Sequence, residues 1–319
     1  MKNKIWAVVG LLAVAFSIYL LTRELRGLSI EAFKESLAAI SARGWILSAA
    51  STLVAYAALA GYDHVALLHL RRHVNWIFIS LCSFTTYALS HNIGASVISG
   101  AVVRYRAYSS KGLTAAEIGV LIAFCSFTFA LGVILLTGII LVLRPDITDR
   151  FGDVLPLGAS ATTGAFLLAL VAIYVVGSWL GLRPLRIRSF ELTYPRLRVV
   201  GRQLLIAPIE SAAAAGIVYF ALPELGNPGY LVVLGVFLVS FSVALLSHAP
   251  GGLGVLELVF ITGLPEMNQA DVLAALLVFR MFYLIIPFIV SLGVILAFER
   301  SQYARGDEDG PGPARGDAL

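Results

Sequence analysis

Charged residues are scarce in this chain. Only 13% of its 319 residues are Asp, Glu, Lys or Arg, whereas about 25% is typical of soluble domains. Apolar residues make up 59% of the chain, and the mean hydropathy is +0.89. Apolar runs with so little charge are solvated by lipid rather than water, so the composition excludes a soluble globular protein and a disordered chain. It predicts a polytopic membrane protein.

The sequence also has few cysteines and shows no pattern typical of a metal-binding or nucleotide-binding site. The two cysteines, Cys82 and Cys125, lie within apolar stretches, so they predict packing residues rather than a disulfide or a thiolate metal site. His69 and His73 share a helical face, but no ligand set closes around them. The sequence has no glycine-rich phosphate loop for ATP. We therefore expect no cofactor and no metal ion.

Eight apolar stretches make up most of the chain. The first follows Lys2 and Lys4 and continues past a possible signal-peptide cleavage site, which favours an uncleaved span. The stretches are residues 5–21, 45–62, 76–103, 114–143, 157–180, 203–222, 230–261 and 270–298. Residues 28–41 form an amphipathic pattern, which predicts either a helix at the outer surface or an ordinary connector.

Two of these stretches are interrupted by polar residues and helix breakers. The interruptions are residues 90–94, which include His91, and residues 247–252, which include His248. The segments around them share six identical residues within twelve positions at a constant offset of 157. Chance similarity between two biased segments is one explanation, and an internal repeat is the other.

Positive charge distinguishes two topologies, because cytoplasmic loops collect Lys and Arg. If all eight stretches cross the membrane, nine of these residues lie inside and thirteen outside, against the rule. If the interrupted stretches are re-entrant hairpins, sixteen lie inside and six outside, with Arg280 within a span. The sequence therefore predicts an all-α polytopic membrane protein with six full spans, two re-entrant helical hairpins and cytoplasmic N- and C-termini.

Three crossings in each half would turn the second half upside down relative to the first. The half-repeats would cover about residues 1–143 and 157–298 of a membrane domain, residues 1–300, with a disordered cytoplasmic tail at 301–319. Inverted repeats are typical of secondary transporters, whose substrate site lies where broken helices meet near the membrane midplane. We expect such a site here.

Ionisable residues within the apolar stretches are candidates for this site, because charge at membrane depth is costly. Arg280 lies about ten residues into the last span, and its guanidinium could bind a phosphate. A structural ion pair with Glu210 or Glu257 is the alternative. These two acids could also relay protons or bind a cationic headgroup. Gly251 and Gly252 would let the backbone approach a ligand closely.

Several dispersed motifs resemble the flippase-like family, which comprises the transmembrane region of bacterial lysylphosphatidylglycerol synthases (multiple peptide resistance factors) and their stand-alone relatives. The resemblance covers roughly residues 5–300. The matching motifs are Tyr62-Asp63, Asn92-x-Gly94, Ser99-Gly100, Arg104-Tyr105-Arg106, Pro250-Gly251-Gly252-Leu253-Gly254 with Glu257, and Arg280 with Tyr283 and Pro287.

This resemblance implies movement of anionic or aminoacylated phospholipid, such as lysylphosphatidylglycerol, between the leaflets of the bacterial inner membrane. Arg280 would hold the phosphate, and Arg104 and Arg106 would recruit the headgroup at the cytoplasmic mouth. Acids within the site would balance charge or take an ammonium group. The expected substrate-binding residues are Arg280, Arg104, Arg106, Asn92, Gly94, Asp63, Glu210, Gly251, Gly252, Glu257 and Tyr283.

The resemblance implies no catalytic role, because the sequence lacks the soluble aminoacyl-transferring domain of the full-length synthases. A separate lipid-modifying synthase would then make the substrate, and it is an expected partner beside phospholipid and the membrane. Two alternative functions are an intramembrane enzyme acting on a lipid phosphate and a non-catalytic scaffold for a lipid synthase.

Overall fold

The computed structural model describes residues 30–93, 96–151, 161–181, 185–187, 190–192, 194–247 and 252–308. These ranges are helical apart from loops and one short β-hairpin, which confirms the predicted helical class. The helices are α2 (Ile30–Ala39), α3 (Ala42–His69), α4 (Trp76–Ile93), α5 (Ser96–Ser109), α6 (Ala115–Leu143), the 3-10 helix η2 (Pro145–Phe151), α7 (Ala161–Trp179), α8 (Leu197–Ala221), α9 (Tyr230–Ser247), α10 (Val255–Gly263), α11 (Gln269–Phe279), the π-helix η4 (Arg280–Ile285) and α12 (Ile286–Glu308).

Within the described ranges, five helices are long and apolar enough to cross a membrane: α3, α6, α7, α8 and the continuous helix Gln269–Phe298 formed by α11, η4 and most of α12. Each coincides with a stretch predicted to be a full span. The sixth predicted span, residues 5–21, lies outside the described residues. The protein is therefore a multi-pass membrane protein.

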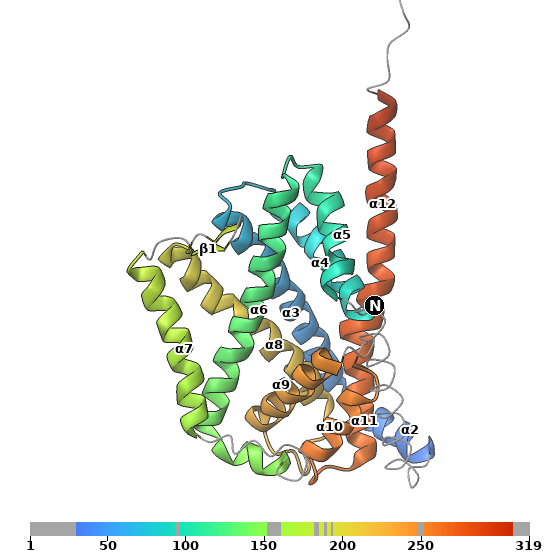
Figure 1. Ribbon diagram of the computed structural model, residues 1–319. Helices are drawn as coiled ribbons and strands as arrows, with labels where there is room; N and C mark the ends of the chain where they lie inside the picture. Colours follow the sequence, from blue (N-terminus) through green and yellow to red (C-terminus); the bar gives the residue numbers. More distant parts are fainter. Residues whose placement is uncertain are drawn as a thin grey trace, which may run out of the picture.

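The two interrupted stretches each form a pair of helices. The helix α4 ends at Ile93, and α5 begins at Ser96; α9 ends at Ser247, and α10 begins at Val255. The members of each pair contact each other. In Figure 1 the α4–α5 pair lies in the upper half of the molecule and the α9–α10 pair in the lower half. The described helices α4 and α9 thus end within the two predicted interruptions, at Ile93 and Ser247, whereas re-entry into a membrane remains a prediction.

Two details differ from the sequence-based expectation. The arginine-rich connection after α7 contains an antiparallel hairpin of β1 (Leu185–Ile187) and β2 (Phe190–Leu192). Its apolar residues alternate with charged ones, which is the period of a strand rather than a helix. In addition, α12 continues to Glu308, so the first part of the predicted disordered tail is helical.

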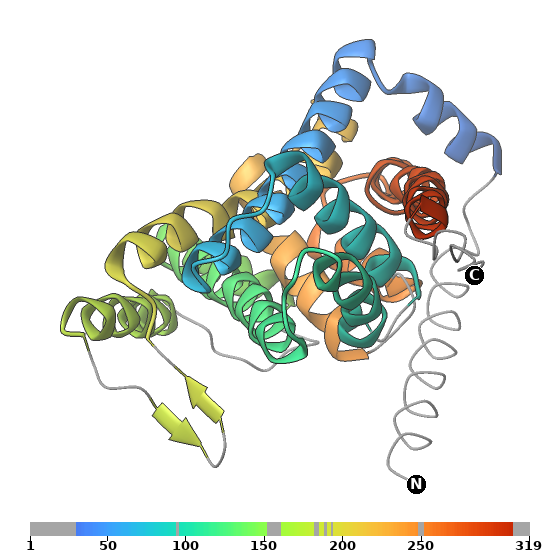
Figure 2. The ribbon, with the colours of Figure 1, turned by 90° about the horizontal axis from the view of Figure 1, so that it is seen from above.

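Close contacts between backbones bring the central helices together. Seen from above, α7 and α12 lie on opposite sides, with α3 and α8 between them (Figure 2). Gly61 of α3 packs against the Ile206 side chain of α8, and Gly132 of α6 packs against the Ala207 carbonyl of α8. Small residues permit this approach because they place little side-chain bulk between the two backbones. Close packing matters in lipid, since hydrophobic burial gives little drive for association between helices there.

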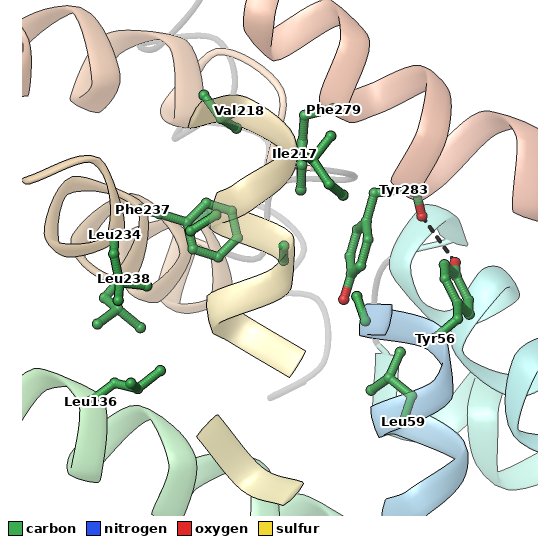
Figure 3. Packing of buried hydrophobic residues seen from close by; sticks show 14 of the residues in the cluster. Tyr56, Leu59, Leu136, Ile217, Val218, Leu234, Phe237, Leu238, Phe279 and Tyr283 are labelled. Carbon is green, nitrogen blue, oxygen red and sulfur yellow. Dashed lines mark hydrogen bonds between the residues drawn. The ribbon is translucent and has the colours of Figure 1, made fainter. Parts of the chain in front are cut away.

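An aromatic row connects the second helix pair to the last long helix (Figure 3). The Phe237 ring of α9 lies edge-on to Phe279 of α11, with centroids 5.7 Å apart. Phe279 stacks on Tyr283 of η4 with centroids 5.1 Å apart. All three side chains are buried. This packing fixes the position of η4 in the centre of the molecule.

We predict that Gly132→Ala destabilises the protein. A Cβ at this position would lie 2.6 Å from the carbonyl carbon of Ala207, so α6 and α8 would have to separate. Gly119→Ala is the matched control, because it lies on the same helix and a Cβ there meets nothing within 4 Å. Thermal unfolding in detergent should show a lower midpoint for Gly132→Ala alone. Equal midpoints for the two variants would contradict the prediction.

Candidate functional site

A π-helical turn at Arg280–Ile285 forms the centre of the candidate site. Pro287 has no N–H, and its ring crowds the carbonyl four residues earlier, which belongs to Tyr283. The Tyr56 hydroxyl of α3 donates a hydrogen bond to this carbonyl at 2.9 Å (Figure 3). A tertiary donor thus replaces the missing helical one. Such turns occur frequently at functional sites.

Both helix breaks converge on this turn. From the end of α4, the Asn92 amide donates to the Leu284 carbonyl at 3.1 Å, and the His91 ring stacks on Tyr283 with centroids 5.1 Å apart. From the connection between α9 and α10, the Gly252 carbonyl accepts from Arg280 at 3.4 Å. Segments that lie far apart in sequence thus meet around η4.

Arg280 forms an ion pair with Glu257. Its Nη2 and Nε atoms donate to Glu257 Oε1 at 2.6 and 2.9 Å. The two side chains are 12% and 11% exposed, so the pair is largely shielded but not sealed. The backbone N–H of Gly254 donates to Glu257 Oε2 at 2.8 Å, and Gly252 and Gly254 have φ values of +65° and +78°, which glycine adopts without strain. Of the two acids predicted as partners of Arg280, Glu257 is the one in contact.

A second ion pair lies deeper in the molecule, between α3 and α5. Arg104 Nη2 donates to Asp63 Oδ1 at 2.6 Å, and Nε donates to Oδ2 at 3.3 Å. Asp63 also accepts from the Tyr108 hydroxyl at 2.9 Å and from the Cys125 thiol at 3.4 Å. The guanidinium lies over the Tyr87 ring, 4.9 Å from its centroid. Arg104 is therefore buried rather than open at the surface, so its position differs from the one expected for headgroup recruitment.

Glu210 of α8 is a third buried acid, and its partners are hydroxyl groups. Tyr283 donates to Oε1 and Ser211 donates to Oε2, the latter at 2.8 Å. Only 3% of Glu210 is exposed. Asp63 and Glu257 each accept from an arginine, so the three acids have different electrostatic surroundings.

Arg106 lies at the end of α5 beside a small surface cavity. The cavity has a volume of about 190 Å³ and is lined by Tyr105, Arg106, Ser109, Ser110 and Phe298. Arg104 and Arg106 are two residues apart on one helix, yet one is buried and the other is exposed. The expected headgroup contact at a membrane surface thus fits Arg106 better than Arg104.

Helix α4 carries buried polar atoms that lack hydrogen-bond partners within the part of the chain that the structure describes. They include Ser83 Oγ, Thr85 Oγ1, Ser90 Oγ and His91 Nδ1. Buried polar groups are normally bonded to protein, water or ligand. This helix therefore has the capacity to bind water or polar ligand groups.

Some predicted residues lie beyond the structural description, and others were missed from sequence. Gly94 and Gly251 fall outside the described ranges, as does His248.

Tyr108 was not predicted, although its spacing of four residues from Arg104 puts both on one helical face. Cys125 was interpreted as a packing residue, but its thiol contacts Asp63. No group of three or more His, Cys, Asp or Glu side chains that could hold a metal ion occurs among the described residues.

Comparison with known sequences identifies the family. The model of the lysylphosphatidylglycerol synthase TM region matches residues 7–291, most of the chain. This protein belongs to that family. The match includes both helix breaks and the π-helical turn, so the candidate site lies wholly within the family domain.

Two relatives resemble this family member over most of both chains. The uncharacterized protein slr0712 of Synechocystis sp. is 32% identical over 260 residues, which are 79% of each chain. The inner membrane protein YbhN of Escherichia coli is 31% identical over 254 residues, or 77% of each chain. A phosphatidylglycerol lysyltransferase of Staphylococcus haemolyticus is 33% identical over 104 residues, which are 32% of this chain and 12% of the relative.

We predict that breaking the Asp63–Arg104 pair from either side is costly. Asp63→Asn or Arg104→Gln leaves an uncompensated charge, which should lower the unfolding free energy by about 3–5 kcal/mol for a buried pair. The double variant should be less destabilised than the sum of the single variants, because neither charge remains. Unfolding in detergent with denaturant measures all three. Additive effects would contradict a direct pair.

Proposed function

We propose that this protein moves anionic or aminoacylated phospholipid between the leaflets of the bacterial inner membrane. The single observation that carries the proposal is the convergence of two helix breaks on the π-helical turn that begins at the shielded Arg280. Membership of a family defined on lysylphosphatidylglycerol synthases supports a lipid-related substrate. A relative named as an inner membrane protein supports the location.

The phosphate would bind by exchange at Arg280. A guanidinium presents a planar fork of donors that suits phosphate oxygens. In the structure Glu257 receives these donors, so an incoming phosphate would replace or share the carboxylate. Glu257 would then hold Arg280 in place between transport events and could receive the ammonium group of an aminoacylated headgroup. The acyl chains would remain in lipid, which reduces the cost of carrying the headgroup across.

The proposed topology places the two helix pairs as re-entrant hairpins from opposite membrane faces. Their positions in opposite halves of the molecule support this arrangement (Figure 1), as does the cytoplasmic excess of Lys and Arg that it produces. Both termini would be cytoplasmic, and the halves, about residues 1–143 and 157–298, would be inverted repeats. Arg106 would contact the headgroup at the cytoplasmic mouth. A separate synthase would supply aminoacylated lipid.

We predict that Arg280→Ala abolishes lipid movement while the protein still inserts and folds. Purified protein in vesicles of phosphatidylethanolamine and phosphatidylglycerol is tested with labelled phosphatidylglycerol, and leaflet exposure is followed by chemical quenching. Arg280→Lys should retain part of the rate, because the charge remains but the fork of donors is lost.

Arg72→Ala is the control for loss of a positive charge. Arg72 forms a surface ion pair with Glu117. It is far from the π-helical turn in the sequence, and its side chain is exposed rather than shielded. We expect its rate to match that of the wild type. If Arg280→Ala moves lipid as fast as the wild type, the assigned phosphate contact is wrong. If folded wild-type protein moves no labelled lipid, the proposed function is wrong, and co-purification with a lipid synthase would favour the scaffold.

A further inference from the structure

Glu210 differs from Asp63 and Glu257 in having no cationic partner among the residues that the structure describes. Its two carboxyl oxygens accept from the hydroxyls of Tyr283 and Ser211. Asp63 and Glu257 each form an ion pair with an arginine instead. A carboxylate in an apolar interior without a counter-charge is costly, and binding a proton removes that cost.

The titratable groups around Glu210 are tyrosines. Tyr56 and Tyr62 approach from α3, and Tyr283 approaches from η4. Titratable groups on other helices packed against α8 have partners elsewhere: the Cys125 thiol of α6 contacts Asp63, the Tyr174 hydroxyl of α7 donates to Gln203, and the Tyr230 hydroxyl of α9 donates to the Ala212 carbonyl. These neighbours supply no positive charge, so the Glu210 carboxylate can be neutralised by binding a proton.

A hydrogen bond couples Glu210 to the turn that holds Arg280. Tyr283 donates to Glu210, and it lies three residues after Arg280 within η4. Its ring is fixed between Phe279 and His91, and its carbonyl accepts from Tyr56. A hydrogen bond to a carboxylate is stronger than one to a neutral acid. Protonation of Glu210 would therefore loosen the contact that positions this turn.

Polar groups on helix α4 lie along a path for protons toward the π-helical turn. His91 stacks on the ring of Tyr283, and its Nδ1 atom is buried without a hydrogen-bond partner among the described residues. The Ser83 and Ser90 hydroxyls on the same helix also lack partners there. These groups can bind water, and water beside His91 would allow protons to reach and leave the interior.

We propose that Glu210 is a proton-binding site that couples proton movement to lipid movement, an inference that rests on the proposed function. In each cycle the Glu210 carboxylate takes up one proton and later releases it on the other side of the membrane. A phospholipid with one negative charge and one proton moving together transfer no net charge, so the membrane potential does not oppose the step. The chain would thereby concentrate lipid in one leaflet at the expense of a proton gradient.

Glu210→Gln tests the proposal, because it keeps an acceptor for Tyr283 and removes the titration. The vesicles contain phosphatidylethanolamine, phosphatidylglycerol, labelled phosphatidylglycerol and an internal pH dye. For the wild type we expect a proton gradient to accelerate lipid movement several-fold, with a pH change inside. For Glu210→Gln we expect that the proton gradient neither accelerates lipid movement nor drives proton flux. Glu266→Gln is the control, since Glu266 forms a partly exposed pair with Arg150 and should behave as the wild type.

Infrared titration gives a second measurement that needs no lipid movement. The wild type should show a carbonyl stretching band of a protonated carboxylic acid that Glu210→Gln lacks. Wild-type lipid movement that is insensitive to the gradient, with no proton flux, overturns the coupling. Absence of the band overturns the proton site. A titrating band without any lipid movement supports the proton site and rejects the proposed function instead.

Discussion

The cost of charge inside an apolar helical bundle determines how the centre of this protein is arranged. Two arginines of the described interior, the buried Arg104 and the largely shielded Arg280, pair with acids from other parts of the chain, Asp63 and Glu257. Each acid then receives further donors, from Tyr108 and Cys125 in one case and from the backbone of Gly254 in the other. These bonds join α3 to α5 and α10 to η4, so charge compensation also fixes the helix packing.

The π-helical turn gives this network its position. Pro287 prevents a regular helix, Tyr56 satisfies the carbonyl that is left, and Asn92 and Gly252 bring the two helix breaks to the same place. Arg280 is the first residue of the turn and Tyr283 is the fourth. One irregular turn thus presents a cation on the side of α10 and a phenol on the side of α8.

The sequence predicted the helix breaks well because they depend on local residues. Asn92 and Gly94 interrupt one apolar run, and Pro250 with neighbouring glycines interrupts the other; the described helices end at Ile93 and Ser247. Partner choice was harder, because contacts between helices depend on three-dimensional packing. The sequence left Glu210 and Glu257 open as partners of Arg280. It did not indicate the thiol of Cys125 beside Asp63, or the difference in burial between Arg104 and Arg106.

The π-helical turn also changes the register of the last long helix. A turn of this kind contains about one residue more than an α-helical turn, which corresponds to a rotation of roughly 100° for everything that follows. The face of α12 that carries Phe298 toward Phe78 of α4 is set by that rotation. Relatives that differ by one residue between Phe279 and Ile286 would present another face of this helix to α4. Alignment gaps in this short segment therefore have structural meaning that gaps in the surface loops lack.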